Sequence, residues 1–425
     1  MNKIDELCAF LDESKSRFHA GAAIVRRLAD QGYTRLAENR PWELTPGGKY
    51  YLTRNDTAVL AFRIPTQAPT GFMLSASHLD RPTFLVKENG ELTGDYTRLA
   101  TEIYGGMLIH PWLDRPLSIA GRVLVETETG IESRLVDIDR DLCMIPNLAI
   151  HQNRTANDGV KWNPAVDTLP LLGSKDAAGK LDQLLEEIAG GKILSRDLYL
   201  YVRDKARLWG IDNEYLCSAA LDDLMCVWGC MEGFLAARDT TAIPVLCVLD
   251  SEEVGSSSIQ GADSTLLSGT LARITRSLSL DEDILLANSF MVSADNAQAL
   301  HPNHPELGDK TSPAFPGGGV VIKYNANQAY TSDGLSAAIF RKICSDAGVP
   351  TQIFHNRADL RSGSTLGRIS LNHVSVPSVD IGLAQFAMHS CWESASAQDP
   401  IHLLNAMTAY YGTALTATES GYTIH

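Results

Sequence analysis

The sequence predicts an α/β protein in which both ends of the chain build one domain around an inserted β-rich segment. Three observations support this prediction. The chain has 425 residues, more than one ordinary hydrophobic core accommodates. From Ser218 onward, strand and helix patterns alternate as in βαβ units. Between about residues 91 and 213, short strands dominate. We therefore expect a discontinuous domain of residues 1–90 and 214–425, and an inserted domain of residues 91–213.

The N-terminal part combines a helical pattern with a strand. Apolar residues recur at helical intervals between residues 7 and 28, and Gly32 is a typical stop. The apolar run of residues 71–77 predicts a strand, which ends in small side chains just before His78.

The inserted segment carries a hairpin signal. Residues 118–126 and 131–139 alternate in the manner of strands and flank a turn at residues 127–130. Residues 146–170 are irregular and polar, and residues 181–189 predict a helix.

The C-terminal half predicts helices between strands. Ser218 is a candidate N-cap for a helix whose apolar face includes Leu221 and Trp228. Apolar runs predict strands near residues 243–250, 320–325 and 378–383.

Composition excludes several classes of protein. The hydrophobic fraction of 44% and charged fraction of 20% are typical of globular proteins. A net charge of −15 without a basic stripe argues against nucleic acid as a partner. No apolar stretch reaches the roughly 18 residues of a membrane helix. The N-terminus lacks the apolar core of a signal peptide, and the eight scattered cysteines are typical of reduced thiols, so we expect a cytoplasmic location without membrane association.

Two adjacent glutamates, Glu252 and Glu253, follow the predicted strand of residues 243–249. Neighbouring carboxylates repel each other, so burying them requires a cation or a proton. At the end of a strand the two side chains can diverge, one to bind a metal and the other to take a proton from water. The alternative is a solvated acidic turn.

Five candidate metal ligands lie beside predicted strand ends or helix starts. They are His78, Asp222, Glu253, Asp295 and His389. Open α/β sheets place their ligand sites at the carboxyl ends of strands, and this mixed nitrogen and oxygen set suits zinc, with manganese or cobalt as alternatives. Asp222 is the candidate bridging carboxylate because the first turn of a helix favours its ionised form.

Each of these residues also has an ordinary structural explanation. His78 and His389 would be hydrogen-bonded core histidines, Asp222 a helix cap and Asp295 part of a turn. Asp80 would either orient the imidazole of His78 or be a surface charge. The spacing of these residues alone therefore does not decide between a dimetal hydrolase and a protein in which they have only structural roles.

Short motifs run in one order through nearly the whole chain. They are Ser16-Arg17-Phe18-His19-Ala20, Ser77-His78-Leu79-Asp80-Arg81-Pro82, Tyr104-Gly105-Gly106, residues 112–123, Pro146-Asn147-Leu148-Ala149-Ile150-His151, Asp250-Ser251-Glu252-Glu253-Val254-Gly255, Ser293-Ala294-Asp295, His301-Pro302-Asn303, Gly363-Ser364-Thr365-Leu366-Gly367, residues 379–385 and Ala387-Met388-His389-Ser390. In this order they resemble the aspartyl aminopeptidase family of metallopeptidases.

The resemblance implies a zinc-peptidase (phosphorylase/hydrolase-like) α/β sandwich with an inserted β-rich dimerisation domain. It implies two divalent ions per subunit, most often Zn²⁺. His78 and Asp295 would bind one ion, Glu253 and His389 the other, and Asp222 would bridge them. Glu252 would be the general base, with Asp80 supporting His78.

The resemblance also assigns substrate-binding residues and an assembly. Lys323 would bind the acidic side chain of the substrate, and His301 and Tyr330 would line the site. His151 would reach the active site of a neighbouring subunit in a tetrahedral dodecamer. Taken alone, Lys323 would be a surface lysine at a strand end, and His151 a loop histidine without a role.

Four departures from the family pattern surround the predicted substrate pocket. Many members have serine at the position of Arg81 and asparagine at that of Asp223. Some have histidine at the position of Gln298 and glycine at that of Ser362. None of these changes removes a predicted metal ligand. They bear on the rim of the pocket, and so on how strictly the enzyme would prefer acidic residues.

The predicted reaction is the removal of N-terminal Asp or Glu from peptides. A broader dimetal aminopeptidase or amidase on the same scaffold is one alternative. A non-catalytic assembly protein is the other, and the intact set of five ligands plus Glu252 argues against it.

Overall fold

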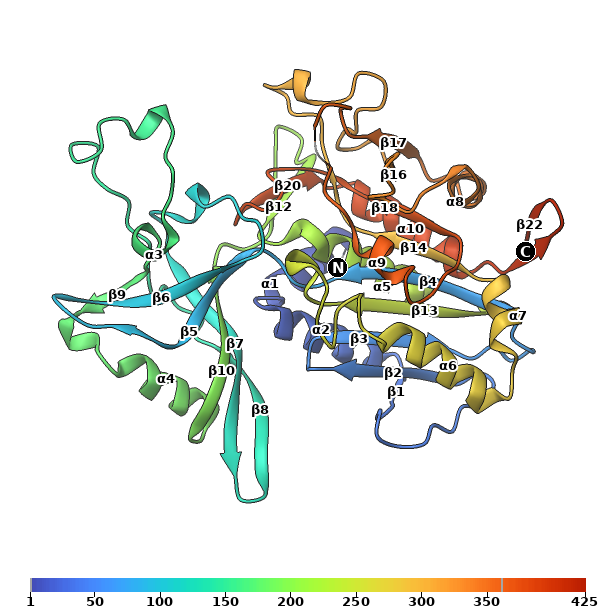
Figure 1. Ribbon diagram of the computed structural model, residues 1–425, viewed down its shortest axis with the longest axis horizontal. Coiled ribbons are helices and arrows are strands. Elements are labelled where there is room, and N and C mark those ends of the chain that lie inside the picture. Colours follow the sequence, from blue (N-terminus) through green and yellow to red (C-terminus); the bar gives the residue numbers. More distant parts are fainter. Residues whose placement is uncertain (1, 361) are drawn as a thin grey trace.

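The computed structural model describes residues 2–360 and 362–425, and its largest element is a nine-stranded sheet (Figure 1). The strands lie in the order β1 (Thr34–Arg35), β2 (Lys49–Arg54), β3 (Ala58–Arg63), β13 (Ala242–Leu249), β4 (Gly71–His78), β14 (Phe290–Ala294), β18 (Ser378–Gly382), β16 (Val320–Tyr324) and β17 (Thr351–His355). The central strands β13, β4, β14 and β18 are parallel. Their carboxyl ends therefore meet at one edge of the sheet.

Helices cover both faces of this sheet, because its central strands are apolar on both sides. One face packs against α1 (Lys3–Glu13), α2 (Arg17–Asp30), α5 (Leu221–Ala236), α8 (Gly334–Asp346) and α10 (Asp399–Tyr411). The other face packs against α6 (Leu266–Leu278), α7 (Glu282–Ala287) and α9 (Leu366–Ser370). The result is an α/β domain, as the residue patterns predict, and it has the sandwich arrangement that the family resemblance implies.

A second sheet of six strands stands beside the sandwich, at the left of Figure 1. Its order is β8 (Gly130–Asp137), β7 (Leu117–Thr127), β10 (Ile193–Val202), β5 (Thr83–Leu92), β6 (Tyr96–Tyr104) and β9 (Leu171–Ser174). The amphipathic helix α4 (Lys180–Ala189) buries Leu181 and Leu185 in the core of this sheet. The β7–β8 hairpin agrees with its sequence signal. The sheet takes its strands from residues 83 to 202, while the division of the chain into domains at residues 91 and 213 stays a prediction.

Smaller elements complete the described part of the chain. A five-stranded sheet contains β11 (Arg207–Trp209), β12 (Tyr215–Ser218), β20 (Glu393–Ser396), β19 (Ala384–Phe386) and β15 (Ala297–Gln298), and β21 (Leu415–Thr418) pairs with β22 (Gly421–Ile424). Short helices are α3 (Pro164–Asp167), η1 (His110–Trp112), η2 (Ala156–Asp158), η3 (Lys175–Ala177), η4 (Glu252–Val254) and η5 (Pro305–Leu307).

The start of α5 differs from its prediction. Ser218 ends β12 and is not the N-cap, because the left-handed residue Ala220 (φ 59°) separates the strand from the helix. The dihedral angles of Asp222 and Asp223 are not helical. Asp222 therefore precedes the regular part of the helix, and its side chain is held by contacts other than those of a helical turn.

The N-terminal helical pattern is divided into two helices. Ser14 ends α1, and the side chain of Ser16 caps α2 by accepting a hydrogen bond from the backbone N–H of His19. None of the helices in the described residues is both long and apolar enough to span a membrane.

Candidate active site

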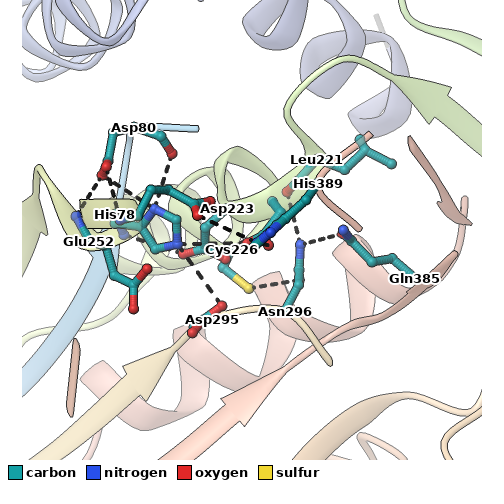
Figure 2. Close-up of polar contacts among 12 residues, drawn as sticks. His78, Asp80, Leu221, Asp223, Cys226, Glu252, Asp295, Asn296, Gln385 and His389 are labelled. Carbon is teal, nitrogen blue, oxygen red and sulfur yellow. Dashed lines mark hydrogen bonds and ion pairs between the residues drawn. The ribbon is translucent and has the colours of Figure 1, made fainter. Parts of the chain in front are cut away.

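Three neighbouring parallel strands deliver acidic and imidazole side chains to one edge of the central sheet (Figure 2). His78 is the last residue of β4. Glu252 and Glu253 follow β13 in η4, and Asp295 comes directly after β14. The loop after β19 adds His389. Carboxyl ends of parallel strands are the usual place for ligand sites in such sheets.

Two clusters of potential metal ligands share the carboxylate of Asp222. One contains His78, Asp222 and Asp295, and the other contains Asp222, Glu253 and His389; within each, the ligand atoms lie within 4.8 Å of one another. Asp222 Oδ1 lies 3.6 Å from His78 Nε2, and Asp222 Oδ2 lies 3.6 Å from His389 Nε2. The two oxygens of one carboxylate thus serve different clusters.

The residues of these clusters fit divalent metal ions. Asp222 Oδ1 and Glu253 Oε1 are buried and have no hydrogen-bond partner among the described residues. Buried carboxylate oxygens without partners are costly unless a cation compensates them. Two imidazoles with three carboxylates form the nitrogen and oxygen donor set that zinc accepts.

The electrostatics of the site also favour bound cations. Burial, reinforced by the charge of Asp295, raises the pKa of Asp222 to about 6. Burial also raises the pKa of Glu253 well above its usual range, with Asp222 as the next cause. Crowded carboxylates resist ionisation because their charges are desolvated and repel one another. A cation at this place would offset that cost.

Glu252 lies beside the clusters. With His78 and Glu253 it forms a third group of potential ligands, whose atoms lie within 4.8 Å of one another, and its side chain remains partly exposed. Burial raises its pKa to about 8, despite the opposing effect of His78. Glu252 therefore combines closeness to the clusters with access from solvent.

Both imidazoles present Nε2 to the clusters because their Nδ1 atoms have other partners. His78 Nδ1 lies 3.1 Å from the carbonyl oxygen and 3.5 Å from Oδ1 of Asp80. His389 Nδ1 lies 2.5 Å from the carbonyl oxygen of Gly106. Such contacts fix the tautomer and the direction of a metal-binding histidine.

Lys323 is almost completely buried, with 2% of its surface exposed, and lies next to Asp295. Its Nζ donates to the carbonyl oxygens of Asp295 (2.7 Å) and Asn296 (3.3 Å), and it lies 3.7 Å from Asp295 Oδ2. The ring of buried Tyr330 is 5.1 Å from this ammonium group. The structure therefore brings Lys323 and Tyr330 to the site.

Two other predicted substrate residues lie outside the metal-ligand clusters. His301 is exposed and lines a cavity of about 360 Å³ that also includes Gln298 and His355. His151 is exposed in the loop between β8 and α3 of the second sheet and is not part of the clusters formed by its own chain.

Sequence reasoning missed one buried acid at the site. Glu393 accepts hydrogen bonds from the backbone N–H groups of Asp222 (3.0 Å) and His389 (2.7 Å). One carboxylate thus fixes the main chain of two candidate ligands. Glu393 opens β20 in the third sheet, and nothing in its local sequence distinguishes it from a surface glutamate.

Comparison with known proteins identifies the family of this chain. Residues 10–411 match the family model described as aminopeptidase I zinc metalloprotease (M18). The chain therefore belongs to the M18 family of zinc aminopeptidases, which are metal-dependent hydrolases, and the resemblance to this family is confirmed.

Individual relatives agree along nearly the whole chain. A probable M18 family aminopeptidase 2 of Clostridium novyi is 42% identical over 96% of this chain and 99% of its own length. A protein of the same name from Pseudomonas aeruginosa is 39% identical over 95% of this chain and 97% of its own.

Solved structures share the fold. The chain matches one in a cryo-EM structure of the Ape4 and Nbr1 complex with a TM-score of 0.93 and 32% identity, over 96% of this chain and 85% of that one. The mApe1 dodecamer of S. cerevisiae matches with a TM-score of 0.85 and 25% identity, over 96% of both chains.

Proposed function

We propose that this aminopeptidase removes N-terminal aspartate and glutamate from peptides at a centre of two zinc ions. One observation carries the proposal of two ions: the oxygens of Asp222 lie 3.6 Å from two different imidazoles, each in its own ligand cluster. A carboxylate placed in this way is suited to bridging a pair of cations.

The residues divide between the two ions as follows. His78 and Asp295 would hold one ion, Glu253 and His389 the other, and Asp222 would contact both. The bound ions would supply Lewis acidity to the scissile carbonyl and to the attacking water. Manganese or cobalt would suit the same donor set.

Glu252 would act as the general base. Its carboxylate would accept a proton from the attacking water and later deliver that proton to the leaving amine. Its position beside His78 and Glu253, together with its partial exposure, supports this role. Asp80 would hold His78 in the required orientation through Nδ1.

Lys323 would provide the preference for acidic side chains. An ammonium group has three N–H donors, and two of them bond to the carbonyl oxygens of Asp295 and Asn296. The third would bond the carboxylate of the substrate beside Tyr330. A charge-assisted hydrogen bond contributes about 1.5–3 kcal/mol, which corresponds to roughly tenfold to hundredfold in preference. His301 would line the approach to this pocket.

Assembly into a homo-oligomer forms part of the proposal. A relative of the same fold is described as a dodecamer. The second sheet would provide a dimer contact, from which the exposed His151 would reach the active site of a neighbouring copy. A cytoplasmic location stays a prediction.

A panel of chromogenic aminoacyl substrates tests the specificity. We expect kcat/KM for aspartyl and glutamyl substrates to exceed that for alanyl and leucyl substrates by about tenfold or more, given one charge-assisted bond. A metal chelator should abolish all activity, and added zinc should restore it. Equal rates on all substrates would indicate a broader aminopeptidase.

The variant Lys323→Ala tests the source of the preference. Because the charge of Lys323 would favour only acidic substrates, the ratio of aspartyl to alanyl kcat/KM should fall toward one. Lys342→Ala is the control, since Lys342 is exposed on α8 and pairs with Asp346. An unchanged ratio in Lys323→Ala would refute the assignment.

A further inference from the structure

Tyr104, the last residue of β6 in the second sheet, and the bend of Gly105 and Gly106 that follows it contact the candidate active site. Tyr104, the last residue of β6, donates a hydrogen bond of 2.7 Å from its hydroxyl to Asp80 Oδ2. Gly105 (φ +75°) lies so close to Glu253 that an added Cβ would be 3.1 Å from the Cβ of Glu253. The carbonyl oxygen of Gly106 meets His389 Nδ1. The last residue of a strand in the second sheet and the two residues after it thus touch both ligand clusters of a site built mainly on the central sheet.

Asp80 is the point through which Tyr104 reaches the catalytic loop. Asp80 Oδ1 accepts the backbone N–H of Glu252 (3.1 Å) and lies 3.5 Å from His78 Nδ1. Asp80 Oδ2 accepts the backbone N–H of Glu253 (3.1 Å) and the hydroxyl of Tyr104. The buried carboxylate of Asp80 therefore sets the positions of three functional residues at once, as Figure 2 shows for His78 and Glu252.

The hydroxyl of Tyr104 is itself held in place. Arg17 Nη1 donates to it at 3.0 Å, and the guanidinium carbon lies 5.0 Å from the ring centre. Burial and the charge of Asp80 raise the pKa of Tyr104, so the phenol keeps its proton and acts as a donor. The hydroxyl oxygen accepts from Arg17 while its proton goes to Asp80, and hydrogen bonds linked in this way strengthen each other.

We propose that Tyr104 is a positioning residue through which the second sheet orients the metal-binding and catalytic residues of the sandwich. Its hydroxyl fixes the carboxylate of Asp80, and Asp80 in turn fixes His78, Glu252 and Glu253. This inference rests on the proposed metal centre and adds a residue outside it. It also gives the second sheet a part in catalysis besides any contact with other subunits.

Tyr104→Phe and Tyr199→Phe form a matched pair of variants. Tyr199, on β10 of the same sheet, is also buried against Arg17, whose guanidinium carbon is 4.9 Å from its ring centre. Arg17 also bonds the hydroxyl of Tyr199, and that hydroxyl does not contact Asp80. Each variant removes one oxygen next to the same arginine, but only Tyr104→Phe removes a contact to Asp80.

The measurement is the equilibrium affinity of the metal-stripped protein for zinc, obtained by competition with a chromophoric chelator. Loss of a contact that orients a ligand typically weakens metal binding or activity about tenfold to hundredfold. We expect Tyr104→Phe to bind zinc about tenfold more weakly than the unmodified protein. We expect Tyr199→Phe to match the unmodified protein. On reloading with zinc, Tyr104→Phe should have a lower kcat with little change in KM.

Two further measurements separate positioning from general stabilisation. Thermal unfolding of the metal-stripped proteins should show that both variants fold, with the larger fall in melting temperature for Tyr104→Phe, because it loses the bond to Asp80 as well as the bond to Arg17. In a double-mutant cycle with Asp80→Asn, the effects on zinc affinity should not add, because Tyr104 acts through Asp80. Additive effects would overturn the proposal, as would equal zinc affinities in Tyr104→Phe and Tyr199→Phe. Failure of the unmodified protein to bind zinc would instead refute the proposed metal centre.

Discussion

The carboxylate of Asp222 lies between two imidazoles at equal distances of 3.6 Å, and its buried Oδ1 has no hydrogen-bond partner among the described residues. Asp295 and Glu253 stand close to it in the two ligand clusters. Several carboxylates gathered in a buried site cost stability unless cations are bound, because desolvation and repulsion both oppose ionisation. These groups lie at the carboxyl ends of the central parallel strands, which is the usual place for ligand sites in such sheets.

Glu252→Gln tests the role of the base at the scale of one residue. The amide has nearly the same size and cannot accept the proton of the attacking water. We expect two zinc ions per chain and an unchanged melting temperature, with kcat reduced at least about hundredfold, as for loss of a general base. Metal analysis and steady-state kinetics check this expectation. Full activity with both metals bound would exclude Glu252 as the base.

The sequence places the predicted ligands beside predicted strand ends or a helix start, and the structure brings their side chains together, although Asp222 precedes the regular part of its helix. It did not reveal Glu393 or the contacts of Tyr104. Glu393 reaches Asp222 and His389 from the third sheet, and Tyr104 reaches Asp80 from the second. Such contacts depend on how separate sheets meet, and local sequence patterns carry no information about that.

Among the elements, α5 and α10 pack closely against each other. A Cβ at Gly233 would lie 2.5 Å from Met407 Cβ and 2.9 Å from the Met407 carbonyl carbon. A Cβ at Gly229 would lie 2.7 Å from Leu403 Cδ2. These glycines permit the two helices to approach, and the sequence reading of an apolar helix face could not show this.

Gly233→Ala is therefore expected to destabilise the protein. The added methyl group meets backbone atoms that cannot move aside, and overpacking of this kind costs about 1–3 kcal/mol. Gly269→Ala is the control, because Gly269 is exposed in α6 and an added Cβ there has no atom within 4 Å. That substitution should stabilise the protein by roughly 0.5–1 kcal/mol through helix propensity.

Thermal and denaturant unfolding of the two variants give the comparison. The melting temperature should fall for Gly233→Ala and rise or stay level for Gly269→Ala. A Gly233→Ala variant as stable as the unmodified protein would contradict the tight helix contact.

Across the whole molecule, the alternation of strands and helices and the hairpin of the second sheet agree with predictions from hydrophobic periodicity, and the sandwich agrees with what the family resemblance implies. The start of α5 differs, because an αL residue and non-helical dihedral angles at Asp222 and Asp223 follow from the tertiary site and not from helix propensity. The sequence pattern did not reveal the break between α1 and α2, because apolar residues recur at helical intervals on both sides of it. Short-range patterns thus predict elements well and their exact ends less well.

In the proposed assembly, the segment of residues 146–166, which includes η2 and the first turn of α3, would contact another copy of the chain. It exposes Leu148 (60%), Ile150 (48%) and Val166 (64%), near His151. We expect light scattering to show a particle of twelve chains, as in the related dodecamer. The double variant Leu148→Asp/Ile150→Asp should form smaller particles, because buried charge opposes apolar contact. A monomer at assay concentrations in the unmodified protein would contradict this prediction.

Anomalous X-ray diffraction at the zinc edge can locate the two ions proposed at Asp222. Crystals of zinc-loaded protein should show two peaks per chain on either side of the Asp222 carboxylate, roughly 3.5–4 Å apart as in other two-metal sites. One peak should adjoin His78 and Asp295, and the other Glu253 and His389. A single peak, or peaks away from Asp222, would contradict the account.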